Sequence, residues 1–389
     1  VRISFMINEE SKYRKYFNIE ENIAYLNSGY MGLLPIKSVS EGSEGFNMKS
    51  RSWEIQMDDF YDKPEKARNL FSKLINADSN SVFFTPSASY AFAVFANNFK
   101  LNKRKTILLL EEEFPSNVWV WKELAKKQNG LVKFVSRPLD DDWTSAILDH
   151  IDIDTALVSV PNCHWVDGGL INLEILSCEL KRNDIALSID GTQSVGVMPI
   201  DIAKIKPDFM AVSGYKWCLG PYSLGLAYID KKYHNGEPIE YNWLSKFPIP
   251  SDNNFPDMTI YENFKFDSAR KFDFGQRGNF HLMPALASSL ELLSDIGPET
   301  MYDYVDNLNQ EIIKITSEIG FSNIEEKYRA KHYLGLRFEN DIPNDFIQNL
   351  ANEKVFISAR GKKTIRVTPH IWNNLNDVDK FINVLKKVL

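Results

Sequence analysis

Two short runs of this sequence contain residue types that could serve one catalytic centre. Asp190 and Gln193 stand in the run Ser-Ile-Asp-Gly-Thr-Gln, and Lys216 stands in the run Val-Ser-Gly-Tyr-Lys-Trp. An ionised carboxylate at the end of a buried strand needs a cation, and a protonated pyridine nitrogen would provide one. Lys216 could form a Schiff base with an aldehyde on the same ring, and Gln193 could contact its phenolic oxygen. Because pyridoxal 5'-phosphate carries these groups, the two runs predict it as the cofactor.

Each of these residues also has an ordinary structural interpretation. Asp190 could cap a helix, and Lys216 could be a solvated surface lysine. The catalytic interpretation depends on their shared context. Both residues follow β-rich stretches, and ligands of open α/β folds bind at the carboxyl ends of parallel strands.

The elements that must position these residues follow a βαβ pattern between about residues 80 and 230. Several strand-like runs, most clearly 107–110, are apolar at consecutive positions, which suits strands covered on both faces of a mostly parallel sheet. Helix-like stretches at 90–99, 117–128 and 173–182 separate some of these runs. We expect strands at 82–85, 106–110, 131–138, 156–161, 184–190, 209–214 and 225–229.

The composition changes around 235–265, where glycine, proline, asparagine and aspartate crowd together. We therefore predict a large cofactor-binding α/β domain over residues 21–254. A smaller α+β domain is predicted over residues 255–389, with residues 1–20 packed on it. Apolar residues at spacings of three and four predict a long helix over 301–319, and short strands around 356–360 and 364–369 precede a closing helix from residue 376.

Charge and composition narrow the range of partners. The 389 residues include 45 Lys and Arg against 52 Asp and Glu, and no basic block is present, so we expect no nucleic-acid partner. No apolar run reaches the roughly 18 residues of a membrane span, and we expect a cytoplasmic protein without a membrane partner. The three cysteines show neither a disulfide framework nor a zinc spacing, and the histidines show no ligand spacing, so we expect no metal site.

Several motifs of the sequence resemble, in the same order, those of the class V aminotransferases of fold-type I pyridoxal-phosphate enzymes. The branch that it resembles most is the isopenicillin-N-epimerase-like and cysteine-desulfurase-like group. The resemblance implies a large domain with a mainly parallel seven-stranded sheet and a smaller α+β C-terminal domain. The matching motifs lie at 25–29, 84–89, 113–117, 188–196, 212–217, 274–278 and 365–369.

The resemblance also implies the roles of residues around the cofactor ring. Lys216 matches the family's Schiff-base lysine, Asp190 the partner of the ring nitrogen, and Gln193 the residue at the ring hydroxyl. Phe114 matches the aromatic residue that stacks on the ring. Tyr215 matches the tyrosine before the lysine in kynureninases, where a phenol can donate to the phosphate.

The phosphate needs donors from more than one segment. Ser87, Ala88 and Ser89 stand before a predicted helix, whose free N–H groups and dipole favour an anion, although simple helix capping is the alternative. Ser213 would add a hydroxyl from across the sheet. The resemblance further implies that Gln276 and Arg277 reach the phosphate of a second subunit, which would make the protein a homodimer with shared active sites.

A small amino acid is the predicted substrate. Arg366 matches the family's carboxylate-binding arginine and Arg360 is the competing candidate, because a guanidinium can make two parallel hydrogen bonds to one carboxylate. His164 and Trp165 follow the end of a strand close to the expected cofactor position. A purely structural histidine at 164 is the alternative.

The reaction is less determined than the cofactor. We expect Lys216 to move the α proton, with transamination as the nominal reaction and epimerisation, racemisation or β-eliminating C–S lysis as alternatives. Desulfurases carry a reactive cysteine in the loop that corresponds to 357–364, and no cysteine occurs there. Sulfur transfer through a persulfide is therefore disfavoured. A regulator that binds pyridoxal phosphate without turnover is the alternative from a different class.

Overall fold

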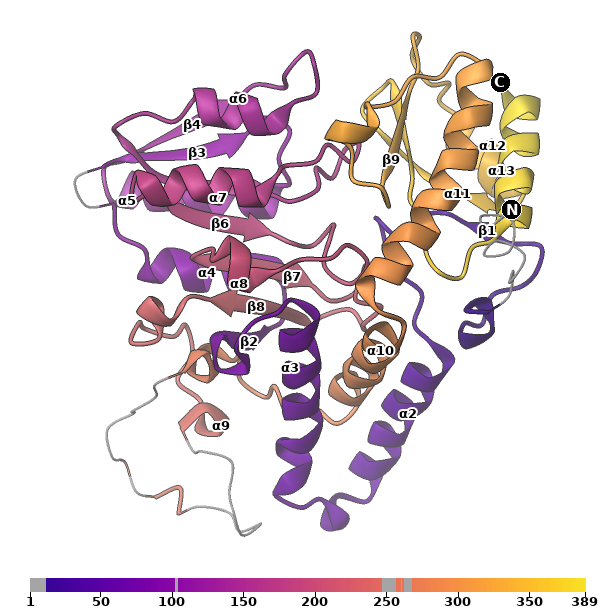
Figure 1. The fold of residues 1–389 in the computed structure, drawn as a ribbon. Coiled ribbons are helices and arrows are strands. Elements are labelled where there is room, and N and C mark those ends of the chain that lie inside the picture. The colour runs from indigo at the N-terminus through magenta and orange to yellow at the C-terminus, as the bar shows by residue number, and fades with distance from the viewer. Residues whose placement is uncertain (1–11, 102–103, 247–256, 260, 262–267) are drawn as a thin grey trace.

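The centre of the molecule is a seven-stranded sheet in the order β2-β8-β7-β6-β5-β3-β4 (Figure 1). The structure is a computed structural model, and it describes residues 12–101, 104–246, 257–259, 261 and 268–389. β8 is antiparallel to both of its neighbours, and the other pairs are parallel. The strands of this sheet are β2 (Val82–Thr85), β3 (Thr106–Leu110), β4 (Leu131–Val135), β5 (Thr155–Pro161), β6 (Ala186–Asp190), β7 (Phe209–Ser213) and β8 (Gly225–Ile229).

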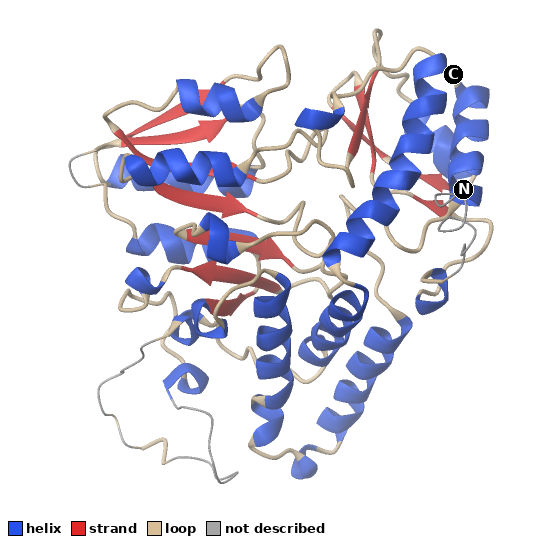
Figure 2. Ribbon diagram, viewed as in Figure 1, coloured by secondary structure: helices blue, strands red, loops and turns tan. Residues whose placement is uncertain are grey.

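Helices cover both faces of this sheet (Figure 2), which explains the consecutive apolar residues of its strands. In β3, Ile107 and Leu109 pack in one core with α4 (Ala88–Asn98) and α5 (Trp119–Lys127). Leu108 and Leu110 point to the other face and pack in a second core. The helices of the second core include α3 (Asp62–Leu74), α6 (Trp143–Asp149), α7 (Leu173–Arg182), α8 (Ile202–Ile205) and α10 (Leu282–Ile296).

The C-terminal part forms a third core around a three-stranded antiparallel sheet in the order β11-β12-β9. The strands are β9 (Leu334–Arg337), β11 (Ser358–Arg360) and β12 (Thr364–Val367). A two-stranded sheet joins β1 (Ala24–Tyr25) to β10 (Val355–Phe356). The helices of this part are α11 (Pro298–Glu318), α12 (Phe346–Asn352) and α13 (Leu375–Val388).

Two further helices complete the element list. α2 (Ile36–Ser50) packs along α10, and α9 (Trp243–Lys246) follows the last strand of the large sheet. The predicted domain boundary at 254 and 255, like most of residues 1–20, falls outside the described residues and stays a prediction. Of the N-terminal segment that is described, Arg14 makes an ion pair with Asp377 of α13 at 3.0 Å.

The seven predicted strands are all present, with differences at some ends. β6 begins at Ala186 rather than at residue 184, because Asp184 has a φ of +54° and turns the chain out of the extended conformation. β4 ends at Val135, earlier than the predicted residue 138. The parallel strands point with their carboxyl ends toward the C-terminal part (Figure 1), and this edge carries the site described below.

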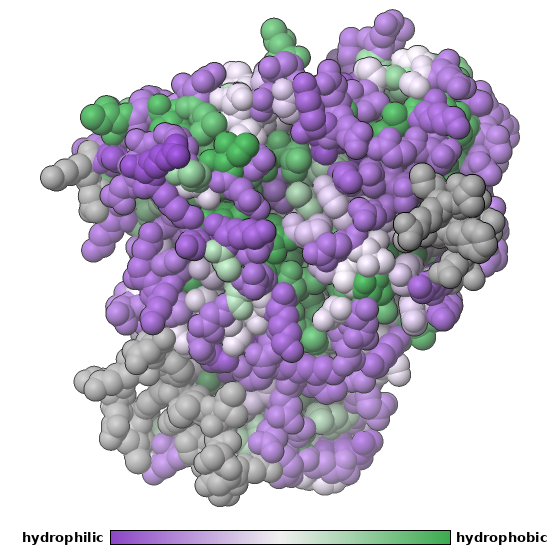
Figure 3. All heavy atoms as spheres, in the orientation of Figure 1, coloured by the Kyte–Doolittle hydropathy of each residue, from purple (hydrophilic) through white to green (hydrophobic). Residues whose placement is uncertain are grey.

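The outer surfaces of the covering helices are mostly polar, and the face drawn in Figure 3 is largely hydrophilic. Within the described part of the chain, no helix combines the length and the hydrophobicity that crossing a bilayer would require.

Candidate active site

The carboxyl ends of β5, β6 and β7 surround a small cavity with about 380 Å³ of empty space. Asp190 is the last residue of β6, and Lys216 lies three residues beyond the end of β7. The adjacent strands are parallel, so their carboxyl ends meet at one edge of the sheet. The lining residues are Ala88, Glu113, Phe114, Pro161, Cys163, Trp165, Asp190, Thr192, Gln193, Ser213, Tyr215 and Lys216.

Asp190 is a buried carboxylate without a close cation. Its Oδ1 accepts the backbone N–H of Thr192 at 2.9 Å, and no described lysine or arginine lies within ion-pair distance. Burial raises its pKa, while hydrogen bonds from Thr192 and the charge of Lys216 oppose this shift. A carboxylate in this position would be stabilised by a cationic ligand in the cavity.

Lys216 is also buried, with 7% of its surface exposed. Burial lowers the pKa of its amine to about 8, and the positive charges of Arg366 and Arg360 act in the same direction. Nζ lies 5.5 Å from the centre of the Phe114 ring and 5.7 Å from that of Tyr215. An amine with this pKa is partly neutral near physiological pH, so it can act both as a nucleophile and as a proton acceptor.

Gly32 allows the chain around it to pack closely on the turn that contains Lys216. The N–H of Gly32 donates to the carbonyl of Tyr215 at 2.9 Å. A Cβ at Gly32 would lie 2.1 Å from the carbonyl oxygen of Lys216, so any larger residue would push the segment away.

Gln193 lines the cavity with its amide already engaged. Nε2 donates to the carbonyl of Gly29 at 3.0 Å, and Oε1 accepts the indole N–H of Trp217 at 2.9 Å. One N–H of the amide stays available for a ligand. The predicted contact with a ring hydroxyl is compatible with this arrangement and stays a prediction.

Glu113 and Thr192 line the cavity although the sequence analysis gave them no role. Burial and the neighbouring Asp190 raise the pKa of Glu113 to about 8, so its carboxyl is largely protonated at neutral pH. Its oxygens accept the backbone N–H of Phe114 at 2.6 Å and the side-chain amide of Asn117 at 3.3 Å. Glu113 therefore holds the segment that positions Phe114. In the sequence, the position of Glu113 directly before Phe114 was the feature that could have indicated this role.

The residues proposed for phosphate binding lie on two sides of the cavity. The Ser87 hydroxyl accepts the N–H of Tyr90 at 3.2 Å and caps α4, whose first residue, Ala88, lines the cavity. Ser89 lies 2.9 Å from Ser87, hydroxyl to hydroxyl. Ser213 and Tyr215 line the cavity from the β7 side. A helix N-terminus with adjacent hydroxyls is suited to an anion.

Arg366, Arg360 and Trp165 meet beside this cavity. The Nη1 of Arg366 donates to the carbonyl of Trp165 at 3.1 Å, and the guanidinium carbon of Arg360 lies 5.2 Å from the centre of the Trp165 ring. The indole N–H of Trp165 donates to the carbonyl of Glu112 at 2.7 Å. The Trp165 ring packs edge to face against Phe114, with centroids 5.5 Å apart.

Two predicted site residues lie elsewhere. His164 does not line the cavity: it is buried, stacks on Trp143 with centroids 5.2 Å apart, and its Nδ1 lies 3.7 Å from Asp167. Arg277, predicted to reach the phosphate of a second subunit, is tied to its own chain. Its Nε lies 2.6 Å from Asp273 and its Nη2 donates to the carbonyl of Leu244 at 3.3 Å.

Both side chains make interior contacts that the sequence does not reveal, and their predicted roles stay predictions. His164 packs on Trp143, and Arg277 pairs with the buried carboxylate of Asp273 four residues away. Gln276 is exposed, with a φ of +61°, and its contact with a second subunit stays a prediction.

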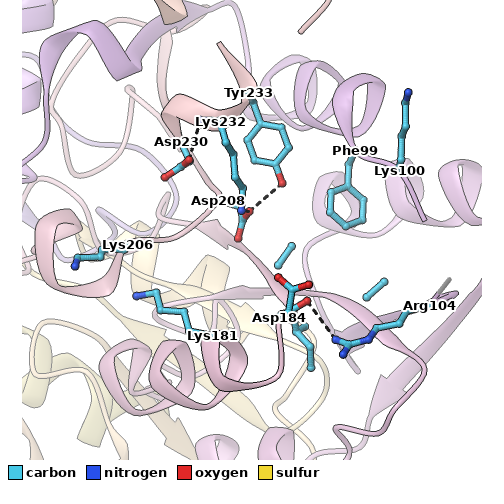
Figure 4. Close-up of a pocket in the computed structure, with 13 residues that line it drawn as sticks. Phe99, Lys100, Arg104, Lys181, Asp184, Lys206, Asp208, Asp230, Lys232 and Tyr233 are labelled. Atoms are coloured by element: carbon cyan, nitrogen blue, oxygen red, sulfur yellow. Dashed lines mark hydrogen bonds and ion pairs between the residues drawn. The ribbon is translucent and has the colours of Figure 1, made fainter. Parts of the chain in front are cut away.

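A second cavity lies at the opposite edge of the large sheet (Figure 4). Asp208 is its most connected group: it accepts the N–H of Leu187 and the hydroxyl of Tyr233, both at 2.9 Å, and pairs with Lys232 at 2.5 Å. Lys181 donates to the carbonyl of Ile205 at 2.6 Å. Most of the polar groups around this cavity are therefore engaged within the protein, in contrast to Lys216 and Asp190.

Comparison with known proteins identifies the family. The family model described as "Aminotransferase class-V" matches residues 40–382. The chain belongs to the class V aminotransferase family. These are pyridoxal-phosphate-dependent enzymes, and the class V motifs of this chain place it among them.

Relatives in this family have several names. A probable cysteine desulfurase of Pyrococcus abyssi is 24% identical over 348 residues, which cover 84% of this chain and 83% of the relative. An uncharacterized aminotransferase of Bacillus subtilis is 24% identical over 345 residues, covering 88% of this chain and 87% of the relative.

Solved structures show the same class V fold. A cysteine desulfurase of Escherichia coli superimposes with a TM-score of 0.81 at 18% identity, covering 97% of each chain. A cystine C–S lyase, in complex with its product cysteine persulfide, gives a TM-score of 0.82 at 16% identity and covers 94% of this chain and 97% of the other.

The residues around the cavity fit pyridoxal phosphate. Among the described residues, neither Asp190 nor Lys216 has a partner within ion-pair distance, although each charge affects the pKa of the other, and the protonated ring nitrogen would supply a close cation to Asp190. Phe114 offers an aromatic face, and the start of α4 offers N–H groups to an anion.

Proposed function

We propose that this class V enzyme acts at the Cα of a small amino acid, with Lys216 holding the cofactor and moving the α proton. The observation that carries the proposal is the Lys216 amine, buried in the cavity wall with a pKa lowered to about 8. Asp190 would hold the ring nitrogen, Gln193 the ring hydroxyl, and the start of α4 with Ser213 the phosphate. When bound, pyridoxal phosphate supplies an electron sink that makes the α proton removable.

Arg366 is suited to bind the α-carboxylate. Its side chain is buried, and its Nε and Nη2 have no partner among the described residues. It lies close enough to Lys216 for its charge to lower the pKa of that amine. A carboxylate bound to these two nitrogens would bring the substrate's Cα near Nζ of Lys216.

The wall of the cavity favours reactions that use one base. Lys216 is the only amine among the described lining residues; the other titratable groups are Asp190, Glu113, Cys163 and Tyr215. Burial raises the pKa of the Cys163 thiol and of the Tyr215 phenol, so neither is an effective base near neutral pH. A two-base epimerisation needs a second proton carrier on the other side of Cα, and the oxygens of Glu113 already accept hydrogen bonds from Phe114 and Asn117. Transamination needs only Lys216 and stays our nominal reaction.

A specific observation favours β-elimination of a sulfur substituent as a second candidate. Desulfurase and C–S lyase names recur among the relatives and solved structures. The strands β11 and β12 are joined by only Gly361, Lys362 and Lys363, a turn too short to carry a mobile thiol to the cavity. Elimination with direct release of the sulfur product needs no such thiol.

A homodimer is also part of the proposal. The outer side of α2 exposes Ile36, Val39 and Phe46, with relative exposures of 50%, 51% and 64%. These positions share one side of the helix, and an apolar strip of this kind suits a subunit interface. Sedimentation of the holoenzyme at micromolar concentration should give the mass of two chains, and a monomer alone would contradict this part of the proposal.

An absorbance screen tests the proposed reaction. The holoenzyme is mixed with individual amino acids, and the cofactor band is followed before the products are analysed. A keto acid that forms only with an amino acceptor supports transamination, whereas keto acid with ammonia and sulfide supports elimination. If the protein binds pyridoxal phosphate but no amino acid changes its spectrum, the protein is a binding module and the proposal is wrong.

A further inference from the structure

Three arginines lie on one face of the three-stranded sheet beside the cavity. In the strand register Arg366 of β12 is opposite Ser358 and Gly335, and Thr364 is opposite Arg360 and Arg337. Side chains of directly opposed residues share a face, as do residues two positions apart in one strand. Arg337, Arg360 and Arg366 therefore all point to the same side, toward the edge of the large sheet.

One of these arginines has its negative partners within the chain. Arg337 donates to both oxygens of Asp141, at 2.8 and 2.9 Å, and to Asp167 at 2.8 Å. These two carboxylates raise the pKa of its guanidinium. Arg337 is therefore an arginine on this face whose charge is fully paired with carboxylates of the same chain.

The other two arginines have no carboxylate partner among the described residues. Arg366 gives one hydrogen bond to the carbonyl of Trp165, and Arg360 gives one to the carbonyl of Ala359 at 2.7 Å. The Nε of each is buried and unpartnered. Both guanidinium groups contact Trp165, which lines the catalytic cavity together with Lys216. In agreement with this, each arginine lowers the pKa of Lys216, and Arg366 lowers that of Arg360.

The carboxyl groups nearby do not balance these charges. Glu112 and Asp167, which line the adjoining cavity, pair with Arg137, and Asp167 also pairs with Arg337. Burial raises the pKa of Asp190, and the ring nitrogen of the cofactor would be the counter-charge of its carboxylate. Glu113 has a pKa of about 8 and is largely uncharged at neutral pH. An amino acid with one carboxylate would neutralise Arg366 and leave Arg360 partly buried without a counter-charge, which is unfavourable.

There is room for a second acidic group next to Arg360. A cavity with about 1110 Å³ of empty space, partly open to solvent, adjoins the catalytic cavity and shares Glu113 and Trp165 with it. Arg360 lines this second cavity and lies over the Trp165 ring. A substrate side chain that passes Trp165 would enter it with Arg360 beside its path.

We infer that the substrate carries a second carboxylate on its side chain, bound by Arg360 while Arg366 holds the α-carboxylate. This inference rests on the proposed function and specifies its substrate class as dicarboxylic amino acids. Arg360 is then a specificity-determining residue. The alternative is that both arginines bind the same α-carboxylate, and substrates that differ only in the distal group separate the two arrangements.

Matched substrates test the inference on the holoenzyme. Aspartate is compared with asparagine, glutamate with glutamine, and S-carboxymethylcysteine with S-carbamoylmethylcysteine, because each pair differs only in whether the distal group is a carboxylate or its amide. We expect kcat/KM to favour the acidic member of at least one pair by about tenfold to a hundredfold, the usual range for a hydrogen bond to a charged group. Ratios within about twofold for all pairs, in an enzyme that turns these amino acids over, would overturn it.

Substitutions connect this preference to Arg360. Arg360→Gln should bring the ratio close to one, and Arg360→Lys should keep part of it, since an ammonium retains the charge but not the fork. Lys327→Gln is the control, because Lys327 belongs to the same C-terminal part, is 63% exposed and lines neither cavity. The control should keep the wild-type ratio; a ratio that Arg360→Gln leaves unchanged would contradict the assignment.

A binding measurement separates failure of the inference from failure of the proposed function. The dissociation constant of glutarate for the holoenzyme, measured by calorimetry, should be about tenfold or more below that of its monoamide, and Arg360→Gln should remove this difference. Equal constants for the two ligands would overturn the inference. Absence of turnover with every amino acid would instead contradict the proposed function, whatever glutarate does.

Discussion

The two edges of the large sheet hold their charged groups in different ways. At the opposite edge from the catalytic cavity, the carboxylate of Asp208 meets a backbone N–H, a tyrosine hydroxyl and Lys232. At the carboxyl edge, Lys216 and Asp190 are both buried, and neither has an ion-pair partner among the described residues. The same strands pass between the two edges, so the difference comes from what the loops provide.

Paired charges of the kind seen at the opposite edge stabilise the fold, whereas unpaired buried charges of the kind seen at the carboxyl edge are typical of a ligand-binding site. A buried charge without a partner destabilises the folded protein, and such groups persist mainly where a ligand completes them. The opposite edge shows that this fold can pair its buried carboxylates. The unpaired groups at the carboxyl edge are therefore best explained by the cofactor and substrate.

The largest expected effect follows from removing the unpaired amine. Lys216→Ala should abolish measurable turnover, because proton transfer by a positioned side chain alone contributes about a hundredfold to ten-thousandfold. The thermal midpoint of the cofactor-free protein should not fall, since the change removes a buried charge. The matched control is Lys232→Ala at the opposite edge, which should retain turnover. Wild-type rates in Lys216→Ala, measured on the best substrate found, would show that the amine has no catalytic role.

The next effect concerns the carboxylate. Arg366→Ala should lower kcat/KM by about a hundredfold or more, because two hydrogen bonds to a charged group are lost at roughly 1.5 to 3 kcal/mol each. Arg366→Lys should recover only part of the loss. The cofactor spectrum serves as the control for an intact site. If both variants turn over amino acids normally, the carboxylate is bound elsewhere.

A change at the opposite edge should affect stability rather than catalysis. Asp208→Asn removes the charge that pairs with Lys232 and one of the oxygens that accept hydrogen bonds. We expect the free energy of unfolding in urea to fall by about 1 to 3 kcal/mol, with kcat/KM unchanged. A loss of activity without a loss of stability would show that this edge communicates with the catalytic cavity.

The smallest effect is expected at the cysteines. Cys163 lines the catalytic cavity, but burial keeps the pKa of its thiol well above the ordinary value, so a thiolate is scarce at neutral pH. Cys163→Ser should leave any sulfide release from cysteine unchanged, as should replacement of Cys178 or Cys218. Loss of sulfide release in Cys163→Ser alone would support sulfur transfer through a persulfide on that residue.

Much of the fold could be predicted from the sequence because the sheet is covered on both sides. Runs such as 107–110 are apolar at every position, and the two faces of β3 do pack in separate cores. Asp190 and Lys216 could be placed for the same reason, since each closely follows an apolar strand. Element ends were harder to predict, as at Asp184, where one left-handed residue delays the start of β6.

By itself the sequence determined the parallel sheet, the cofactor and the edge where Asp190 and Lys216 meet, since these follow from apolar runs and local motifs. Only the tertiary structure decided which side chains face the cavity. His164 packs on Trp143, Arg277 pairs with Asp273, and Glu113 lines the catalytic cavity. The structure alone also showed that Arg337 pairs with Asp141 and Asp167, whereas Arg360 and Arg366 have no carboxylate partner among the described residues. These outcomes depend on contacts between residues distant in sequence, and the burial and charge of each side chain are set by those contacts.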